Sequence, residues 1–114
     1  MKVFLKTAAA AACISVLLSA TAFAGGDAAK GKALFNDPKF AGSATGKSCS
    51  TCHPNGKGLE DAAGKSEWRM MGGKFSSLEA VVNYCIEKAL HGKKIDPKSD
   101  DMLNIVEYIR SLKK

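Results

Sequence analysis

Two cysteines and one histidine lie within five residues of the chain, in the run Cys49-Ser50-Thr51-Cys52-His53. On a single helical turn the two thiols point the same way, and the histidine emerges beside the second of them. This spacing is typical of c-type haem attachment, in which each thiol forms a thioether and the histidine binds the iron. The sequence therefore predicts one covalent haem c held by Cys49 and Cys52, with His53 as the proximal iron ligand.

Three other uses of these residues are less favoured. A thioredoxin-like redox pair requires the motif to lie between a strand and a helix, and that context is absent from the sequence. A zinc site needs four ligands, and the fourth would have to come from Cys85 or His91, without the second paired spacing of convincing zinc motifs. A plain disulfide between two of the three cysteines downstream of residue 24 is the third alternative.

The first 24 residues have the pattern of an export signal. Two lysines precede an apolar run from Ala8 to Leu18, and Ala22-Phe23-Ala24 provides an A-x-A cleavage site. We expect a signal peptide over residues 1–24 and a mature domain over residues 25–114. The expected location is the periplasm, where thioethers to haem are formed in bacteria.

The composition of the mature domain limits its partners and its core. Removal of the leader, which has two lysines and no acidic residue, lowers the net charge from +6 to +4. This modest charge, together with export, argues against nucleic acid as a partner. The apolar run is too short to span a membrane, and no later stretch approaches about 20 apolar residues. Because the domain has few large apolar side chains, we expect haem to form much of its core.

Two helices are predicted near the ends of the mature domain. The first covers about residues 28–35, with Asp27 as its N-cap, and ends at Asn36-Asp37-Pro38. The last begins after Pro97, with Ser99 as its cap and acidic residues in its first turn. Both patterns indicate short amphipathic helices.

A third helix is predicted near residues 77–90. Ser76 and Glu79 have the spacing of a capping box, and Gly92 is the expected stop. One stripe at helical spacing is predicted to face the interior. Its members are Leu78, Val81, Val82, Cys85 and Ala89.

Glycines concentrate between Gly42 and Gly73 and interrupt any long hydrophobic period. Nothing in this middle segment is a convincing strand, so the predicted fold class is all-α. Four basic residues there could form a rim at a haem edge and attract an acidic redox partner. They are Lys57, Lys65, Arg69 and Lys74.

The chain resembles the class I c-type cytochromes over nearly all of its mature length. Three segments carry the resemblance: residues 26–35 (GDAAKGKALF), 49–53 (CSTCH) and 106–112 (VEYIRSL). In that family the first and last helices cross beside the haem. The resemblance implies the same crossing here, with Gly31 and Phe35 meeting the Tyr108 region.

The helix over residues 78–90 and the following Gly92-Lys93 resemble a narrower group. They are similar to the haem domains of thiosulfate dehydrogenases and of the A subunit of the Sox thiosulfate-oxidising complex, in which a cysteine of this helix ligates the iron. The resemblance implies Cys85 as the distal iron ligand. It agrees with the absence of methionine from residues 92–98, where class I cytochromes usually carry the ligand.

Four other residues stay open as distal ligands. Met102 lies on the stripe of the last helix, and Met70 and Met71 lie in the glycine-bounded middle segment. His91 follows Cys85 by less than two turns. Each of them also has an ordinary structural use, as a core methionine, a gap filler or a solvated helix end.

The preferred function is that of an exported monohaem electron carrier rather than an enzyme, working between redox proteins. A catalytic or sensory haem domain is the alternative, since thiolate ligation would lower the potential and suit sulfur chemistry. An intermediate possibility is a small haem subunit of a sulfur-compound-oxidising complex.

Overall fold

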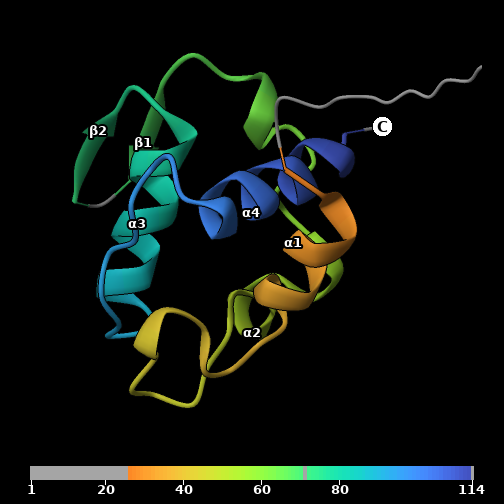
Figure 1. The fold of residues 1–114 in the computed structure, drawn as a ribbon. Helices are drawn as coiled ribbons and strands as arrows, with labels where there is room; N and C mark the ends of the chain where they lie inside the picture. Colours follow the sequence, from red (N-terminus) through yellow and green to blue (C-terminus); the bar gives the residue numbers. More distant parts are fainter. Residues whose placement is uncertain (1–25, 71, 114) are drawn as a thin grey trace, which may run out of the picture.

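The computed structural model describes residues 26–70 and 72–113. The predicted signal peptide therefore lies outside the described residues, and no described helix is long and apolar enough to cross a membrane. The described chain is predominantly helical and has one small sheet (Figure 1). The helices are α1 (Ala28–Phe35), α2 (Cys49–Cys52), α3 (Leu78–Lys88) and α4 (Asp100–Ser111), and the strands are β1 (Trp68–Met70) and β2 (Gly73–Phe75). Three 3₁₀ turns are Phe40–Gly42, Pro54–Gly56 and Ala62–Gly64.

Helices α1 and α4 cross closely where α1 has a glycine. Gly31 is buried against the backbone of Asn104, and one turn later the ring of Phe35 meets that of Tyr108 edge-on, with centroids 5.0 Å apart. At the start of α1, the backbone N–H of Asp27 donates to Oδ1 of Asn104 at 2.7 Å. The expected crossing of the first and last helices is confirmed, and Figure 1 shows α1 beside α4.

Gly31→Ala is expected to lower the free energy of unfolding by about 2–3 kcal/mol, because the added Cβ would overlap the carbonyl oxygen of Asn104. Urea unfolding of the haem-loaded protein measures this loss. Gly64→Ala is the matched control, since a Cβ at Gly64 meets no atom within 4 Å. The control should stay within about 0.5 kcal/mol of the parent. Equal stability of the two variants would show that the crossing tolerates a side chain.

The N-cap of helix α3 lies one residue later than the sequence predicts. Ser77, not Ser76, is the N-cap, and its Oγ accepts a hydrogen bond from the backbone N–H of Ala80 at 3.1 Å. Two adjacent serines can both cap, so the sequence pattern alone does not separate them. The helix ends at Lys88, two residues before the predicted Leu90.

The prediction that Gly92 stops α3 is wrong. His91 takes the left-handed conformation, with φ of 53°, and the N–H of Gly92 donates back to the carbonyl oxygen of Ile86 at 2.9 Å. Gly92 is needed for another reason, because a Cβ there would lie 2.5 Å from the carbonyl oxygen of Ala41. The glycine thus lets the loop after α1 approach the end of α3.

The predicted apolar stripe of α3 divides into two parts. Leu78 and Val82 are buried together with Ile86, whereas Val81 and Cys85 are only half-covered. The last member of the stripe, Ala89, is exposed in the described structure. The half-covered residues lie one turn apart at one edge of this stripe, beside the buried Leu78.

The side chain of Asn83 in α3 forms hydrogen bonds to the segment that precedes α4. Asn83 is 7% exposed. Its side-chain amide donates from Nδ2 to the carbonyl oxygen of Ile95 and accepts at Oδ1 from the N–H of Ile95, both at 2.9 Å. Asn83→Ala is expected to lower the free energy of unfolding by about 2–4 kcal/mol, because it leaves two backbone groups of Ile95 unpaired. Chemical unfolding measures the loss, and Asn36→Ala, which removes an exposed hydrogen bond to Lys32, should cost less than about 0.5 kcal/mol. A loss at Asn83 no larger than at Asn36 would contradict this role.

A short hairpin corrects the all-α prediction. Strands β1 and β2 pair antiparallel, with Trp68 opposite Phe75 and Met70 opposite Gly73. Each strand has three residues and no fully buried side chain, so the sequence carries no alternating pattern for it. The indole N–H of Trp68 donates to the carbonyl oxygen of Ala62 at 2.9 Å and anchors the hairpin to the preceding 3₁₀ turn.

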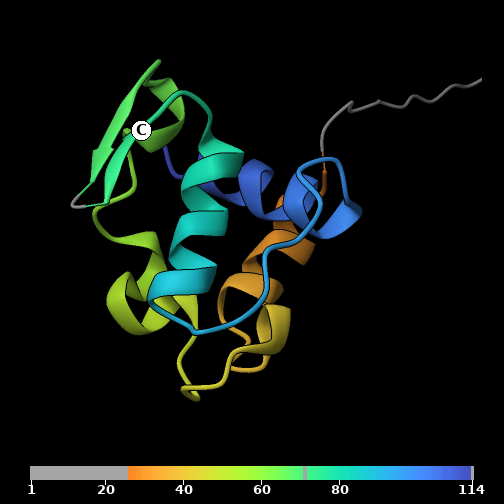
Figure 2. The ribbon, with the colours of Figure 1, turned by 90° about the vertical axis from the view of Figure 1, so that its left-hand side faces the viewer.

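The core is formed mainly by residues of α1, α3 and α4, whose arrangement Figures 1 and 2 show. It consists mainly of aliphatic side chains with three aromatic rings. Its members are Phe35, Phe40, Leu78, Val82, Ile86, Leu90, Met102, Ile105, Val106, Tyr108 and Ile109.

Candidate haem-binding site

Helix α2 is a single turn that presents two thiols. The backbone N–H of Ser48 donates to Oγ1 of Thr51 at 2.9 Å, and the hydroxyls of Ser48 and Ser50 lie 2.7 Å apart. These hydrogen bonds stabilise the N-terminal end of α2, where Ser48 is the N-cap. Cys49 is half-buried against the core and Cys52 is exposed, and both thiols are free. The geometry leaves both thiols available for covalent attachment on one side of the turn.

His53 directly follows α2 and has one ring nitrogen engaged. Its Nδ1 lies 3.0 Å from the carbonyl oxygen of Lys57. Because a carbonyl oxygen only accepts, this hydrogen bond places the ring proton on Nδ1 and leaves the lone pair of Nε2 free. In metal-binding histidines, the ring nitrogen that does not bind the metal typically donates to such a carbonyl oxygen. His53 thus has the tautomer that an iron ligand requires.

Glycines after His53 bring this loop against the last helix. Gly56 has φ of 75° and is buried beside the side chain of Leu112, which a Cβ at Gly56 would overlap. Gly58 has φ of 94°, and a Cβ there would lie 3.5 Å from Nδ1 of His53. The loop that orients the imidazole therefore packs directly against Leu112, the C-cap residue of α4.

The thiol of Cys85 lies close to those of α2. The pKa of Cys49 is raised from an ordinary 9.0 to about 11, chiefly by burial and then by the Cys85 thiol, while a backbone hydrogen bond lowers it and the Cys52 thiol raises it. Burial also raises the pKa of Cys85, with a further contribution from Cys52. Cys85 of α3 thus lies near the motif of α2, and the burial of these thiols disfavours an isolated thiolate. A thiolate there requires a positive partner.

The other candidates for a distal ligand have different surroundings. Met102 is fully buried in the core, and Met70 is half-buried in β1. His91 is exposed at the end of α3, and Met71 lies outside the described residues. The Cys85 thiol interacts electrostatically with the thiols of α2.

This donor set fits haem c better than a bare metal ion. Among residues 26–70 and 72–113, no group of three or more His, Cys, Asp and Glu side chains is placed to hold a metal ion, as the zinc alternative would require. Two free thiols on one turn, an imidazole with a free Nε2 and a third thiol nearby match the needs of a covalently attached haem. Apolar side chains that pack on the core but stay partly uncovered include Cys49, Leu59, Ala62, Ala63, Trp68 and Val81.

The predicted basic rim is partly neutralised. Arg69 and Lys74 both contact Glu67, with N–O distances of 2.9 and 3.8 Å. Lys57 and Lys65 are exposed. Two of the four basic residues are thus paired with a carboxylate, which weakens the attraction of an acidic partner to the middle segment.

The closely crossing terminal helices and the adjacent cysteine and histidine motif are the features of a class I c-type cytochrome. A family model described as "SoxA/TsdA, cytochrome c domain" matches residues 30–114. The chain belongs to this family of cytochrome c domains, and it carries covalently bound haem c with iron. The resemblance to the haem domains of sulfur-oxidising cytochromes is thereby confirmed. Searches of curated proteins and of solved structures gave no match.

Sequence reasoning missed the groups that orient the site. The carbonyl oxygen of Lys57 acts through the backbone, so its residue type carries no signal. The spaced Gly56 and Gly58 were the available indication, because glycines at positive φ often mark a close approach of the backbone to another group.

Proposed function

We propose that this chain is an exported monohaem cytochrome that carries single electrons between redox proteins. Cys49 and Cys52 hold the haem c, His53 is the proximal iron ligand and Cys85 is the distal ligand. The observation that carries the proposal is the nearness of the Cys85 thiol to an α2 motif whose histidine has a free Nε2. Export rests on the leader pattern of residues 1–24.

Each residue has a separate task in this proposal. The Lys57 carbonyl fixes the His53 imidazole, and the turn of α2 fixes both thiols relative to it. Cys85 supplies an anionic sulfur from α3, which favours the ferric state over the ferrous state. When bound, haem c supplies a one-electron ferric/ferrous couple. The surrounding apolar side chains exclude water and keep the change in charge local.

A second candidate is a haem subunit of a larger enzyme that oxidises sulfur compounds. The family match favours it, because the family is described by SoxA and TsdA. The two candidates share the haem site and differ in whether this chain alone turns over a substrate.

Purified haem-loaded protein is expected to oxidise and reduce another exported c-type cytochrome rapidly and without other components. It should show no turnover of thiosulfate when given an electron acceptor, because His53 and Cys85 would both be engaged in holding the iron rather than in binding a substrate. Stopped-flow absorption measures the exchange, and a steady-state assay measures thiosulfate consumption. Sustained thiosulfate turnover by the isolated chain would replace the carrier proposal with the enzymatic one.

A further inference from the structure

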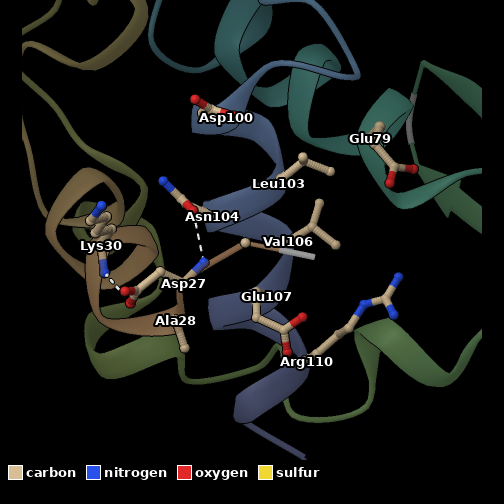
Figure 3. A pocket seen from close by; sticks show the side chains of 11 residues that line it. Asp27, Ala28, Lys30, Glu79, Asp100, Leu103, Asn104, Val106, Glu107 and Arg110 are labelled. Atoms are coloured by element: carbon tan, nitrogen blue, oxygen red, sulfur yellow. Dashed lines mark hydrogen bonds between the residues drawn. The ribbon is translucent and has the colours of Figure 1, made fainter. Parts of the chain in front are cut away.

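Two clefts adjoin on the described part of the chain, and Glu79 and Leu103 line both of them. The first has a volume of about 1060 Å³ and is lined by the start of α1, the first turn of α3 and α4, and Figure 3 shows its side chains. The second has a volume of about 890 Å³ and is lined by α3, Phe75 of β2 and the segment before α4. Because the clefts share two residues, we treat them as one surface and call it the outer groove.

The outer groove has a preformed surface of aromatic and aliphatic side chains. The rings of Phe75 and Tyr84 contact each other at a tilt, with centroids 5.1 Å apart. The backbone of Ile95 is held by its two hydrogen bonds with Asn83. A surface that is fixed before a partner arrives loses little conformational entropy on binding. Four large side chains of the groove are only half-buried: Phe75, Tyr84, Ile95 and Leu103.

Acidic side chains outnumber basic ones along the outer groove. Six carboxylates line it, against four basic side chains, whereas the whole chain has 17 Lys and Arg against 11 Asp and Glu. In the described part of the chain, no ion pair within 4.0 Å involves Glu79, Asp100 or Glu107. The outer groove is therefore a negative surface on a positive protein. Its acidic residues are Asp27, Glu79, Glu87, Asp96, Asp100 and Glu107.

The outer groove lies on the side of α3 that faces away from Cys85. Asn83 and Glu87 line the groove, and at 3.6 residues per turn each lies about 160° round the helix from Cys85. No residue of the α2 motif lines either cleft. An occupant of the groove therefore leaves Cys85 and the turn of Cys49 and Cys52 uncovered.

We propose that the outer groove is the docking surface for a basic protein. Apolar side chains of this partner enter the space lined by Tyr84, Ile95 and Leu103, and its lysines or arginines lie beside Glu79 and Glu107. The inference goes beyond the carrier function, because it assigns a second surface that is separate from the haem-binding residues. The partner holds the cytochrome in place while the end with the α2 motif stays free to exchange electrons.

The charge and chemistry of the outer groove favour a basic protein over other occupants. A symmetric dimer of this chain through the groove would bring two acidic rims together, and an anionic membrane would repel them. A small polar ligand needs buried polar groups to orient it, but the buried Asn83 already uses its side chain on Ile95. An apolar centre with a charged rim is the usual anatomy of a protein–protein interface.

The test measures how the haem-loaded ferrous protein binds a synthetic amphipathic helical peptide that has leucine on one face and lysine on the other. A nuclear magnetic resonance titration gives the dissociation constant and shows which backbone amide resonances shift. Leu103→Lys is compared with Leu34→Lys, which changes another half-buried leucine outside the groove. Glu79→Lys is compared with Glu67→Lys, which makes the same charge change in the middle segment.

Leu103→Lys is expected to raise the dissociation constant by at least about tenfold, because it replaces an apolar anchor of the groove with a positive charge. Glu79→Lys should raise it by about fivefold at low salt, because it reverses a charge of the rim. Each control should change it by less than about twofold. The shifted resonances should belong mainly to the residues of α3 and α4 that line the groove. If Leu103→Lys fails to load haem, Glu79→Lys and its control carry the test.

A parent that does not bind the peptide, equal losses in a variant and its control, or resonance shifts centred on α2 would overturn the proposal. A parent dimer in analytical ultracentrifugation that Leu103→Lys dissociates would assign the groove to a second copy of the chain instead. Binding of the parent to phosphatidylserine vesicles that disappears in the same variant would assign it to a membrane. The carrier function is tested separately: a parent that binds the peptide in the groove but exchanges no electrons would refute that function and support the docking surface.

Discussion

A chain with both Cys49→Ala and Cys52→Ala is expected to lack covalent haem and to be largely unfolded. The core of the described residues is small, and much of the apolar surface beside it stays partly uncovered by protein. Without haem, the described part of residues 40–75 has only 3₁₀ turns, one helical turn and a hairpin of two three-residue strands to order it. The intact mass of the exported protein reports the haem, and far-ultraviolet circular dichroism with a thermal melt reports the fold.

Ser50→Ala is the matched control for this experiment, because it alters the same turn without removing a thiol. It should keep the haem mass, the helical dichroism and a cooperative melt. A cooperative melt with full helical dichroism in the double cysteine variant would show that the side chains alone suffice to fold the domain.

Cys85→Ser is expected to raise the midpoint potential by on the order of 100 mV, because anionic sulfur stabilises ferric iron relative to ferrous iron. The ferric spectrum should also lose the features of a thiolate ligand. A redox titration followed by absorption gives the potential, and electron paramagnetic resonance gives the ligand type. The variant should keep its covalent haem, since the α2 thiols are unchanged.

Met102→Leu separates this prediction from the main methionine alternative. Met102 is fully buried in α4, and leucine conserves its volume, so the change should cost less than about 1.5 kcal/mol of stability. It should leave the potential and the ferric spectrum of the parent unchanged. If Met102→Leu changes both while Cys85→Ser changes neither, Met102 is the ligand and Cys85 is a packed core residue.

Local signals predicted the helices because their ends depend on nearby residues. Asp27 and Ser99 cap α1 and α4 as expected, with side-chain oxygens that accept from the first-turn N–H groups. The choice between Ser76 and Ser77 had no local signal, because both residues are serines and cap helices equally well. The packing of Gly92 against Ala41 depends on a segment about 50 residues away, which a local pattern does not contain.

Some residues of the candidate site could likewise be predicted from local spacing, whereas others depend on how distant segments pack. The roles of Cys49, Cys52 and His53 follow from spacing within five residues, and they stay predictions for the individual residues. The nearness of Cys85 to that motif depends on how α3 packs, and its proposed role came from a resemblance rather than from periodicity. The periodicity grouped Cys85 with Val82, and the structure buries Val82 fully while it leaves Cys85, at the edge of the same stripe, half-covered. The hairpin at Trp68 had no usable signal at all.

The hydrogen bond from Asp27 to Asn104 joins residues 77 positions apart, and the Gly31 contact lies at the same crossing. A chain that emerges from its N-terminus therefore cannot form this contact until nearly all of its length is available. The turn that carries Cys49 and Cys52 emerges about a third of the way through that interval, while α1 still has no partner. High contact order makes such a closure slow. It thus leaves a time window in which an attachment enzyme can reach both thiols on an open chain, before α4 completes the fold around them.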